Sequence, residues 1–108
     1  MLNIDIIDKA FAHCEYSNNP LPIIQTSKYI RWNRDNIDYT NKNKSIFATE
    51  YDIKDNTFLS YSGRKVAWLL ECSLLNNDLY DWILNNYNLY DIIFTHNLEI
   101  SNKIPNSY

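Results

Sequence analysis

Glu71 and His96 are the two residues of this 108-residue chain whose type and position favour acid–base chemistry. Each lies near the end of a short apolar segment, residues 66–70 for Glu71 and residues 92–94 for His96. A carboxyl group among apolar neighbours holds its proton more tightly, which suits it to take a proton from a substrate hydroxyl. An imidazole nearby can orient an oxygen or share the proton. We therefore take Glu71 as a candidate general base and His96 as its neighbour in the site.

A purely structural interpretation of the same residues stays open. Glu71 can be a helix-capping acid, and His96 can be a polar residue that ends a strand before Asn97 caps the next turn. Cys72 adjoins Glu71, whose negative charge opposes formation of a thiolate, so Cys72 is better explained as a small packing residue than as a nucleophile.

The elements that must position these residues form a strand, a helix and a second strand. Residues 66–70 are continuously apolar, which is typical of a strand covered on both faces. A helix should follow, capped by Asn76 or Asn77, because the next apolar residues recur at helical spacing. They are Leu79, Trp82, Ile83, Asn86 and Tyr90. Residues 92–94 then predict another strand. Such a unit implies parallel strands with a right-handed crossover, so Glu71 and His96 should face one crevice at the carboxyl edge.

The rest of the chain indicates more strands, at residues 2–7, 28–32 and 45–51. Residues 9–16 fit a short helix or a loop, and the prolines and asparagines of residues 17–22 break regular structure. Residues 33–44 are polar and predict an exposed loop with little that could pack, while residues 52–65 have the composition of turns. Asn97 can cap one helical turn before the chain trails off through Pro105. We expect an α/β, Rossmann-like three-layer domain with a mostly parallel sheet.

Composition and charge narrow the functional classes. Hydrophobic residues make up 45% and charged residues 21%, as in a globular protein of one domain. A formal net charge of −3 argues against a nucleic-acid partner. No stretch approaches the roughly 20 apolar residues that span a bilayer, and the first residues lack a signal-peptide pattern, so we expect a cytoplasmic protein without a membrane span.

Metal and cofactor sites have little support in the sequence. The two cysteines, Cys14 and Cys72, lie far apart, and the two histidines add no close pairing of the kind that structural zinc requires. Gly63 is the single glycine, which excludes glycine-rich phosphate loops. We therefore expect no metal and no cofactor.

Arg31, Trp32 and Arg34 form a small basic and aromatic cluster. Its cations can hold a phosphate, and its indole can stack on a sugar ring. The alternative is an exposed strand face with long side chains lying along it.

Five segments of the chain carry a resemblance to a known family: residues 11–13, 19–22, 27–32, 65–71 and 90–97. Together they resemble the N-terminal part of glycosyltransferase-like proteins of phages and bacteria, which are distantly similar to the bacterial α-1,3-fucosyltransferase family. The resemblance implies two Rossmann-like domains of the GT-B type. In that family the N-terminal domain binds the acceptor sugar and supplies the base, and the C-terminal domain binds the GDP-sugar.

Carried over to this chain, the resemblance makes Glu71 the general base that activates the acceptor hydroxyl for inverting transfer. His96 and Asn97 would line the acceptor side, and Arg31 and Trp32 complete our candidate acceptor-binding set. Residues 1–108 would then be a single domain, incomplete at its carboxyl-terminal end, because the family's donor-binding residues have no counterpart here. A carbohydrate acceptor is the expected partner, and a nucleotide-sugar donor would bind only with a second domain.

Two alternatives stay open beside the acceptor-binding half of a glycosyltransferase. One is a non-catalytic α/β interaction module that keeps the fold without the chemistry. The other is a fragment without activity of its own, whose exposed faces are covered by self-association into a homo-oligomer.

Overall fold

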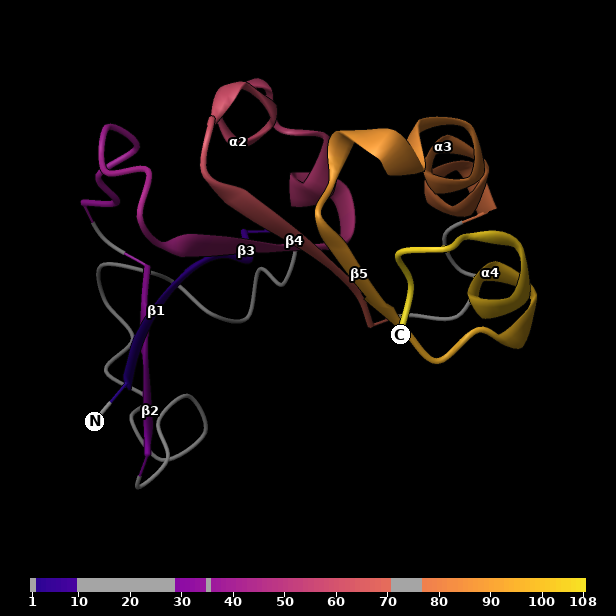
Figure 1. Cartoon of the computed structure of the whole chain (residues 1–108), viewed down its shortest axis with the longest axis horizontal. Coiled ribbons are helices and arrows are strands. Elements are labelled where there is room, and N and C mark those ends of the chain that lie inside the picture. Colours follow the sequence, from indigo (N-terminus) through magenta and orange to yellow (C-terminus); the bar gives the residue numbers. More distant parts are fainter. Residues whose placement is uncertain (1, 10–28, 35, 71–76) are drawn as a thin grey trace.

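The computed structural model describes residues 2–9, 29–34, 36–70 and 77–108. Its five strands form one sheet in the order β2-β1-β3-β4-β5, and every neighbouring pair is parallel (Figure 1). The strands are β1 (Leu2–Ile7), β2 (Ile30–Asn33), β3 (Ser45–Thr49), β4 (Arg64–Leu69) and β5 (Ile92–Thr95). The sheet confirms the predicted α/β, Rossmann-like fold with parallel strands.

Short helices follow each strand from β3 onward. They are η1 (Glu50–Lys54), α2 (Asn56–Ser60), α3 (Asn77–Asn86), η2 (Tyr87–Leu89) and α4 (Leu98–Lys103). Figure 1 shows α2 and α3 on one side of the sheet, with α4 beside α3. In the described part of the chain the helices cover one face of the sheet, so a third layer is not among the elements seen. None of these helices is long and apolar enough to cross a membrane.

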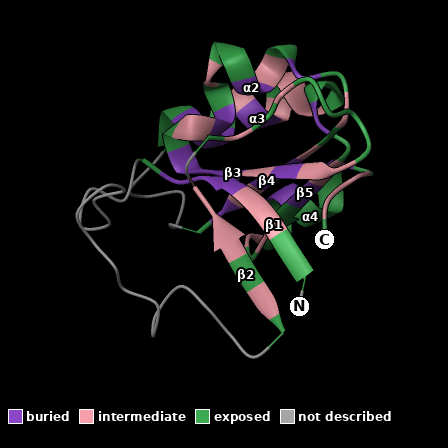
Figure 2. Cartoon of the chain, turned by 90° about the vertical axis from the view of Figure 1, so that its left-hand side faces the viewer, coloured by how far each residue is buried: buried purple, intermediate pink, exposed green. Residues whose placement is uncertain are grey.

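The core lies between the helices and the covered face of the sheet, which we call the helix face (Figure 2). Its strand residues are small or aliphatic, and each is at most 1% exposed. They include Ile46, Ala48, Ala67, Leu69 and Ile93. Phe58 of α2 and Ile83 of α3 pack onto them with no exposed surface. Full burial of one such large side chain contributes about 1.5–3 kcal/mol, so this face supplies much of the folding free energy.

The predicted helical stripe that ends at Tyr90 is only partly helical. α3 stops at Asn86 and the turn η2 follows, yet Tyr90 is still 4% exposed and belongs to the core. Its hydroxyl donates to the Ile53 carbonyl at 2.7 Å and accepts from Trp82 Nε1 at 3.2 Å. Burial raises the pKa of the Tyr90 phenol to about 12.

The prediction of turns throughout residues 52–65 was wrong, because α2 lies within them. The Asp55 carboxylate caps this helix by accepting from the Phe58 backbone N–H at 2.9 Å. A helix of five residues is too short to reveal a period in the sequence. Capping by Asp55 and burial of Phe58 stabilise it instead.

The segment between β2 and β3 packs more than the sequence predicted. Ile37 and Tyr39 are half-buried against the core, and the rings of Tyr39 and Tyr61 meet edge to face with centroids 6.3 Å apart. The Tyr61 hydroxyl lies 2.7 Å from the Asn41 and Lys44 carbonyl oxygens, which fixes the end of this segment. A Cβ on Gly63 would lie 2.2 Å from that hydroxyl oxygen, so the single glycine is required by the close approach of a ring.

The last residues, which we expected to trail off, return to the sheet. Ser107 forms a parallel bridge with Ile93 of β5. The Tyr108 N–H donates to the Ile93 carbonyl at 2.8 Å, and the Thr95 N–H donates to the Tyr108 carbonyl at 2.9 Å. The end of the chain therefore continues the sheet beyond β5.

Candidate functional site

The carboxyl edge of the sheet collects the residues that follow each strand, as parallel pairing requires. Leu69 and Thr95 are register partners on the adjacent strands β4 and β5, so Leu70 and His96 leave the sheet side by side. Glu71, the candidate base, lies outside the described residues, and so does its relation to His96. Cys14, Cys72 and the candidate cap Asn76 also lie outside them.

Four aromatic side chains cross the sheet on the side opposite to the helix face. They are Trp32 of β2, Phe47 of β3, Trp68 of β4 and Phe94 of β5, and we call this side the aromatic face. Ring centroids lie 5.8 Å apart for Trp32 and Phe47, 6.1 Å for Trp32 and Trp68, and 6.3 Å for Phe47 and Phe94. Side chains alternate between the two sides of a strand, so these rings point away from the helices that bury their neighbours.

A cavity of about 580 Å³ lies against the aromatic face. We call it the aromatic cavity; besides the four rings, its lining includes Ile4, Ile30, Leu69, Leu70, Thr95, His96 and Tyr108. Thr95, His96 and Tyr108 bring hydrogen-bonding side chains, and all three lie at the margin of the sheet formed by β5. The cavity thus combines a broad apolar wall with a few polar groups near one end, the usual composition of a small-molecule site.

The candidate acceptor-binding residues divide into two groups in the structure. Trp32 and His96 line the same aromatic cavity. Arg31 is exposed and, by strand alternation, points to the opposite side of the sheet from Trp32. Asn97 caps α4, because its side-chain oxygen accepts from the Ile100 N–H at 3.2 Å. The predicted cap is therefore confirmed, and the Asn97 carbonyl oxygen is engaged within the fold.

Arg34 binds an acid rather than extending the cluster with Arg31 and Trp32. Its Nε and Nη2 nitrogens donate to the two carboxylate oxygens of Asp8 at 2.8–3.0 Å. The Arg34 and Asp8 side chains are 13% and 9% exposed, so solvent screens this bidentate ion pair only weakly. The pair joins the ends of the neighbouring strands β1 and β2 and fixes the Arg34 guanidinium in place.

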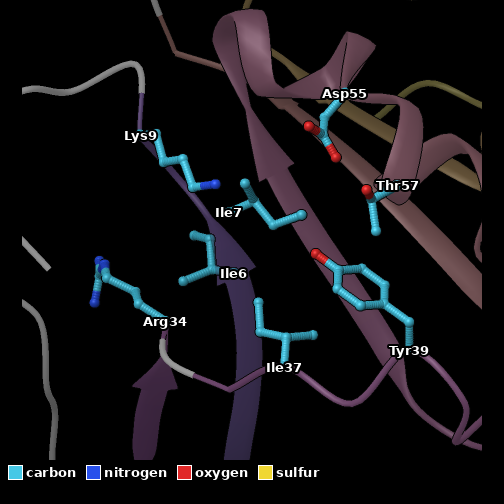
Figure 3. Close-up of a pocket in the computed structure, with 8 residues that line it drawn as sticks. All are labelled: Ile6, Ile7, Lys9, Arg34, Ile37, Tyr39, Asp55 and Thr57. Atoms are coloured by element: carbon cyan, nitrogen blue, oxygen red, sulfur yellow. The ribbon is translucent and has the colours of Figure 1, made fainter.

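A second cavity, of about 260 Å³, opens beside Arg34 (Figure 3). We call it the polar cleft; its lining is Ile6, Ile7, Lys9, Arg34, Ile37, Tyr39, Asp55 and Thr57. Figure 3 shows Lys9 and Arg34 on one side, Tyr39, Asp55 and Thr57 on the other, and isoleucines between them. Sequence reasoning missed this cleft, because its polar residues come from separate segments that form no motif.

The two walls of the polar cleft have opposite electrostatic character. Burial raises the pKa of the Tyr39 phenol, and the negative charges of Asp55, Asp5 and Asp52 raise it further. The wall around Tyr39 holds the Asp55 carboxylate, whereas the other wall holds the Lys9 ammonium and the guanidinium of Arg34, which is paired with Asp8.

Glu50 is another feature of the carboxyl edge that the sequence did not reveal. It follows β3, is 2% exposed and has a φ of 51°, a left-handed conformation that side chains other than glycine rarely adopt. Its carboxylate accepts a short hydrogen bond from the Leu70 N–H, which ties the end of β3 to the end of β4. A strained backbone at such a place is typical of edges that hold a site in shape.

No group of three or more metal-ligating side chains occurs among the residues that the structure describes. A scan against models of known protein families found no match, and searches of curated proteins and of solved structures found none either.

Proposed function

We propose that this domain is the acceptor-binding half of a glycosyltransferase, and that the aromatic cavity holds a sugar ring of the acceptor. The observation that supports the proposal most is the row of rings from Trp32 to Phe94 with His96 at the same cavity. An indole or phenyl face gives a sugar ring a broad apolar contact, while hydroxyl and imidazole groups fix its orientation. Trp32 and His96 were both expected on the acceptor side.

In this proposal transfer needs two further parts. Glu71 removes the proton from the acceptor hydroxyl, as the family resemblance implies, and a second domain binds the nucleotide-sugar. Leu70, which precedes Glu71 in the sequence, lines the aromatic cavity. Uncharged aromatic walls suit a neutral glycan acceptor and leave recognition of the donor diphosphate to the second domain.

Intrinsic fluorescence tests acceptor binding directly. Titration with a panel of neutral mono- and disaccharides should change the emission of Trp32 and Trp68 in a saturable way. Trp32→Ala should weaken binding about tenfold, as loss of one good stacking contact predicts. Trp82→Phe is the matched control, because Trp82 lies on α3 at the helix face. A panel without any saturable response, or equal losses in both variants, would refute the acceptor site.

Transfer itself is tested in a protein that contains both domains. Glu71→Gln keeps the size of the side chain and removes the base, so transfer should fall by at least about a hundredfold. The thermal transition should stay within a few degrees of that of the unchanged protein. Retained transfer by this variant would remove Glu71 from the mechanism.

The exposure of the aromatic face favours a second candidate, a non-catalytic interaction module in which a second copy of the chain covers this face. Leu70 is 42% exposed, Phe94 36% and Tyr108 70%, which is unusual for large apolar side chains grouped around one cavity. Sedimentation velocity over a range of concentrations distinguishes the candidates. The interaction module would be favoured over the glycosyltransferase if the chain self-associates, if Phe94→Asp abolishes this association, and if no saccharide binds.

A further inference from the structure

The polar cleft lies where the order of the strands reverses. In the order β2-β1-β3-β4-β5, β1 is followed along the chain by β2 on one side, while β3 and the later strands lie on the other. Open α/β sheets bind ligands outside the carboxyl ends of their strands at this point. Ile6, Ile7 and Lys9, at the end of β1, line the polar cleft. The polar cleft and the aromatic cavity share no lining residue, so the cleft is a separate site.

The cationic wall is prepared for an anion. Arg34 is held by Asp8 through its Nε and Nη2 nitrogens, which leaves the two N–H groups of Nη1 and the second N–H of Nη2 as further donors. Lys9 is exposed and makes no ion pair with any residue that the structure describes. One cation is therefore fixed by a largely buried acid, and a second can move to meet a ligand. A phosphate oxygen bound between them would accept charge-assisted hydrogen bonds from both.

The opposite wall offers acceptors and hydroxyls rather than cations. One carboxylate oxygen of Asp55 caps α2 through the Phe58 N–H, and the other can accept from a ligand hydroxyl. In Figure 3 the Tyr39 hydroxyl points into the cleft and Thr57 lies beside Asp55. A second anion would be repelled at this wall, because the Asp55 carboxylate lines it. A group of hydroxyls would be bound there.

We infer that the polar cleft is a binding site for a small phosphorylated polyol, such as a sugar monophosphate. Its phosphate lies against Lys9 and Arg34, and its hydroxyls lie against Asp55, Thr57 and Tyr39. A cavity of about 260 Å³ fits a ligand smaller than drug-sized compounds, whose pockets start at about 300 Å³. The inference goes beyond the acceptor site and does not rest on it, since the two cavities have different walls and different chemistry.

Two-dimensional ¹H–¹⁵N NMR of the full chain tests this site, with glucose 6-phosphate as the probe at low ionic strength. The probe should shift the amide signals of Lys9, Arg34, Tyr39 and Thr57 in a saturable way. Inorganic phosphate should bind more weakly, and glucose should leave these four signals unchanged. Absence of shifts at these four amides would refute the cleft site. Absence of shifts at the Trp32 and His96 amides would concern only the acceptor site.

Matched variants sharpen the test. Lys9→Gln should weaken glucose 6-phosphate about tenfold, through loss of one charge-assisted contact. Lys42→Gln makes the same change of charge at an exposed position outside the cleft and should have no effect. Thr57→Val should weaken glucose 6-phosphate but not inorganic phosphate. Equal binding of both probes with no effect of Thr57→Val would overturn the polyol assignment, and so would equal effects of the two lysine variants.

Discussion

The two faces of the sheet are made by the same strands and differ in what covers them. On the helix face, Ala48 and Ala67 have no exposed surface, and the absence of bulk lets the helices approach closely. On the aromatic face, their chain neighbours Phe47 and Trp68 are only half-buried. Small and aliphatic residues thus make one face a packing surface, while a row of neighbouring rings borders a cavity on the other. A difference of one residue along a strand therefore separates the packed face from the face that borders the cavity.

This division predicts that equal truncations have unequal costs on the two faces. A ring buried under helices leaves a void when it is removed, whereas a ring that borders a cavity leaves little additional empty space. Four substitutions test this division, and they are given in order of decreasing cost to stability.

Phe58→Ala should cost about 3–5 kcal/mol of unfolding free energy, because Phe58 is fully buried between α2 and the sheet. Urea denaturation followed by far-UV circular dichroism measures the loss. Leu98→Ala, at a position that is 78% exposed, is the control and should change the free energy by no more than about 0.5 kcal/mol. A loss below about 1 kcal/mol for Phe58→Ala would mean that the helix face is not the main core.

Alkaline pH should weaken the helix face through Tyr90. The pKa of its phenol is about 12 in the fold against 10.0 ordinarily, so both states are protonated below pH 10 and the contribution is fully present there. Between pH 10 and 12 the unfolded phenol ionises first, and up to about 2–3 kcal/mol of stability is lost. The stability advantage of the native protein over Tyr90→Phe should therefore shrink across this range. Tyr51→Phe, at a 53% exposed position, should show no such trend, and equal trends in both would contradict the assignment.

Glu50→Ala should cost about 1–3 kcal/mol, because the Leu70 N–H at the carboxyl edge loses its acceptor. Glu99→Ala is the matched control. Its pair with Lys103 is 2.8 Å long but more than half exposed on both sides, so its loss should leave the unfolding free energy nearly unchanged. Chemical denaturation of both variants measures the difference. Equal small losses would show that Glu50 does not hold the two strand ends together.

Phe94→Ala, on the aromatic face, should cost about 1 kcal/mol or less, since the ring is 36% exposed and borders the cavity. The same denaturation experiment compares it with Phe58→Ala. A cost of about 3 kcal/mol or more would overturn the comparison, because it would identify the aromatic face as a second core.

Much of the fold could be predicted from the sequence, because its strongest signals are long and local. The apolar strand near Trp68, the helical spacing from Leu79 and the strand before His96 gave the parallel unit β4-α3-β5. The helix α2 was missed because five residues carry no measurable period. The packing of Ile37 and Tyr39 was missed because two apolar residues in a polar segment resemble an ordinary loop.

The candidate site was less predictable, because it depends on register and on residues distant in sequence. His96 was placed correctly at the carboxyl edge beside β4 by the rule for parallel strands. Arg31 and Trp32 were grouped as neighbours, although the period of two in a strand already separates them to opposite faces. The polar cleft joins Lys9, Arg34 and Asp55, and nothing local in the sequence links these residues. Tertiary contacts alone bring them together.

The return of residues 106–108 to β5 has a consequence for assembly. The N–H groups of Ile93 and Thr95 and the Ile93 carbonyl are already bonded to these residues, so this margin of the sheet offers few free groups to a strand from another molecule. β2, at the other margin of the described sheet, pairs with β1 on one side. Pairing with a strand of another molecule is therefore disfavoured at the β5 margin of the sheet. Any such association should occur at the β2 margin.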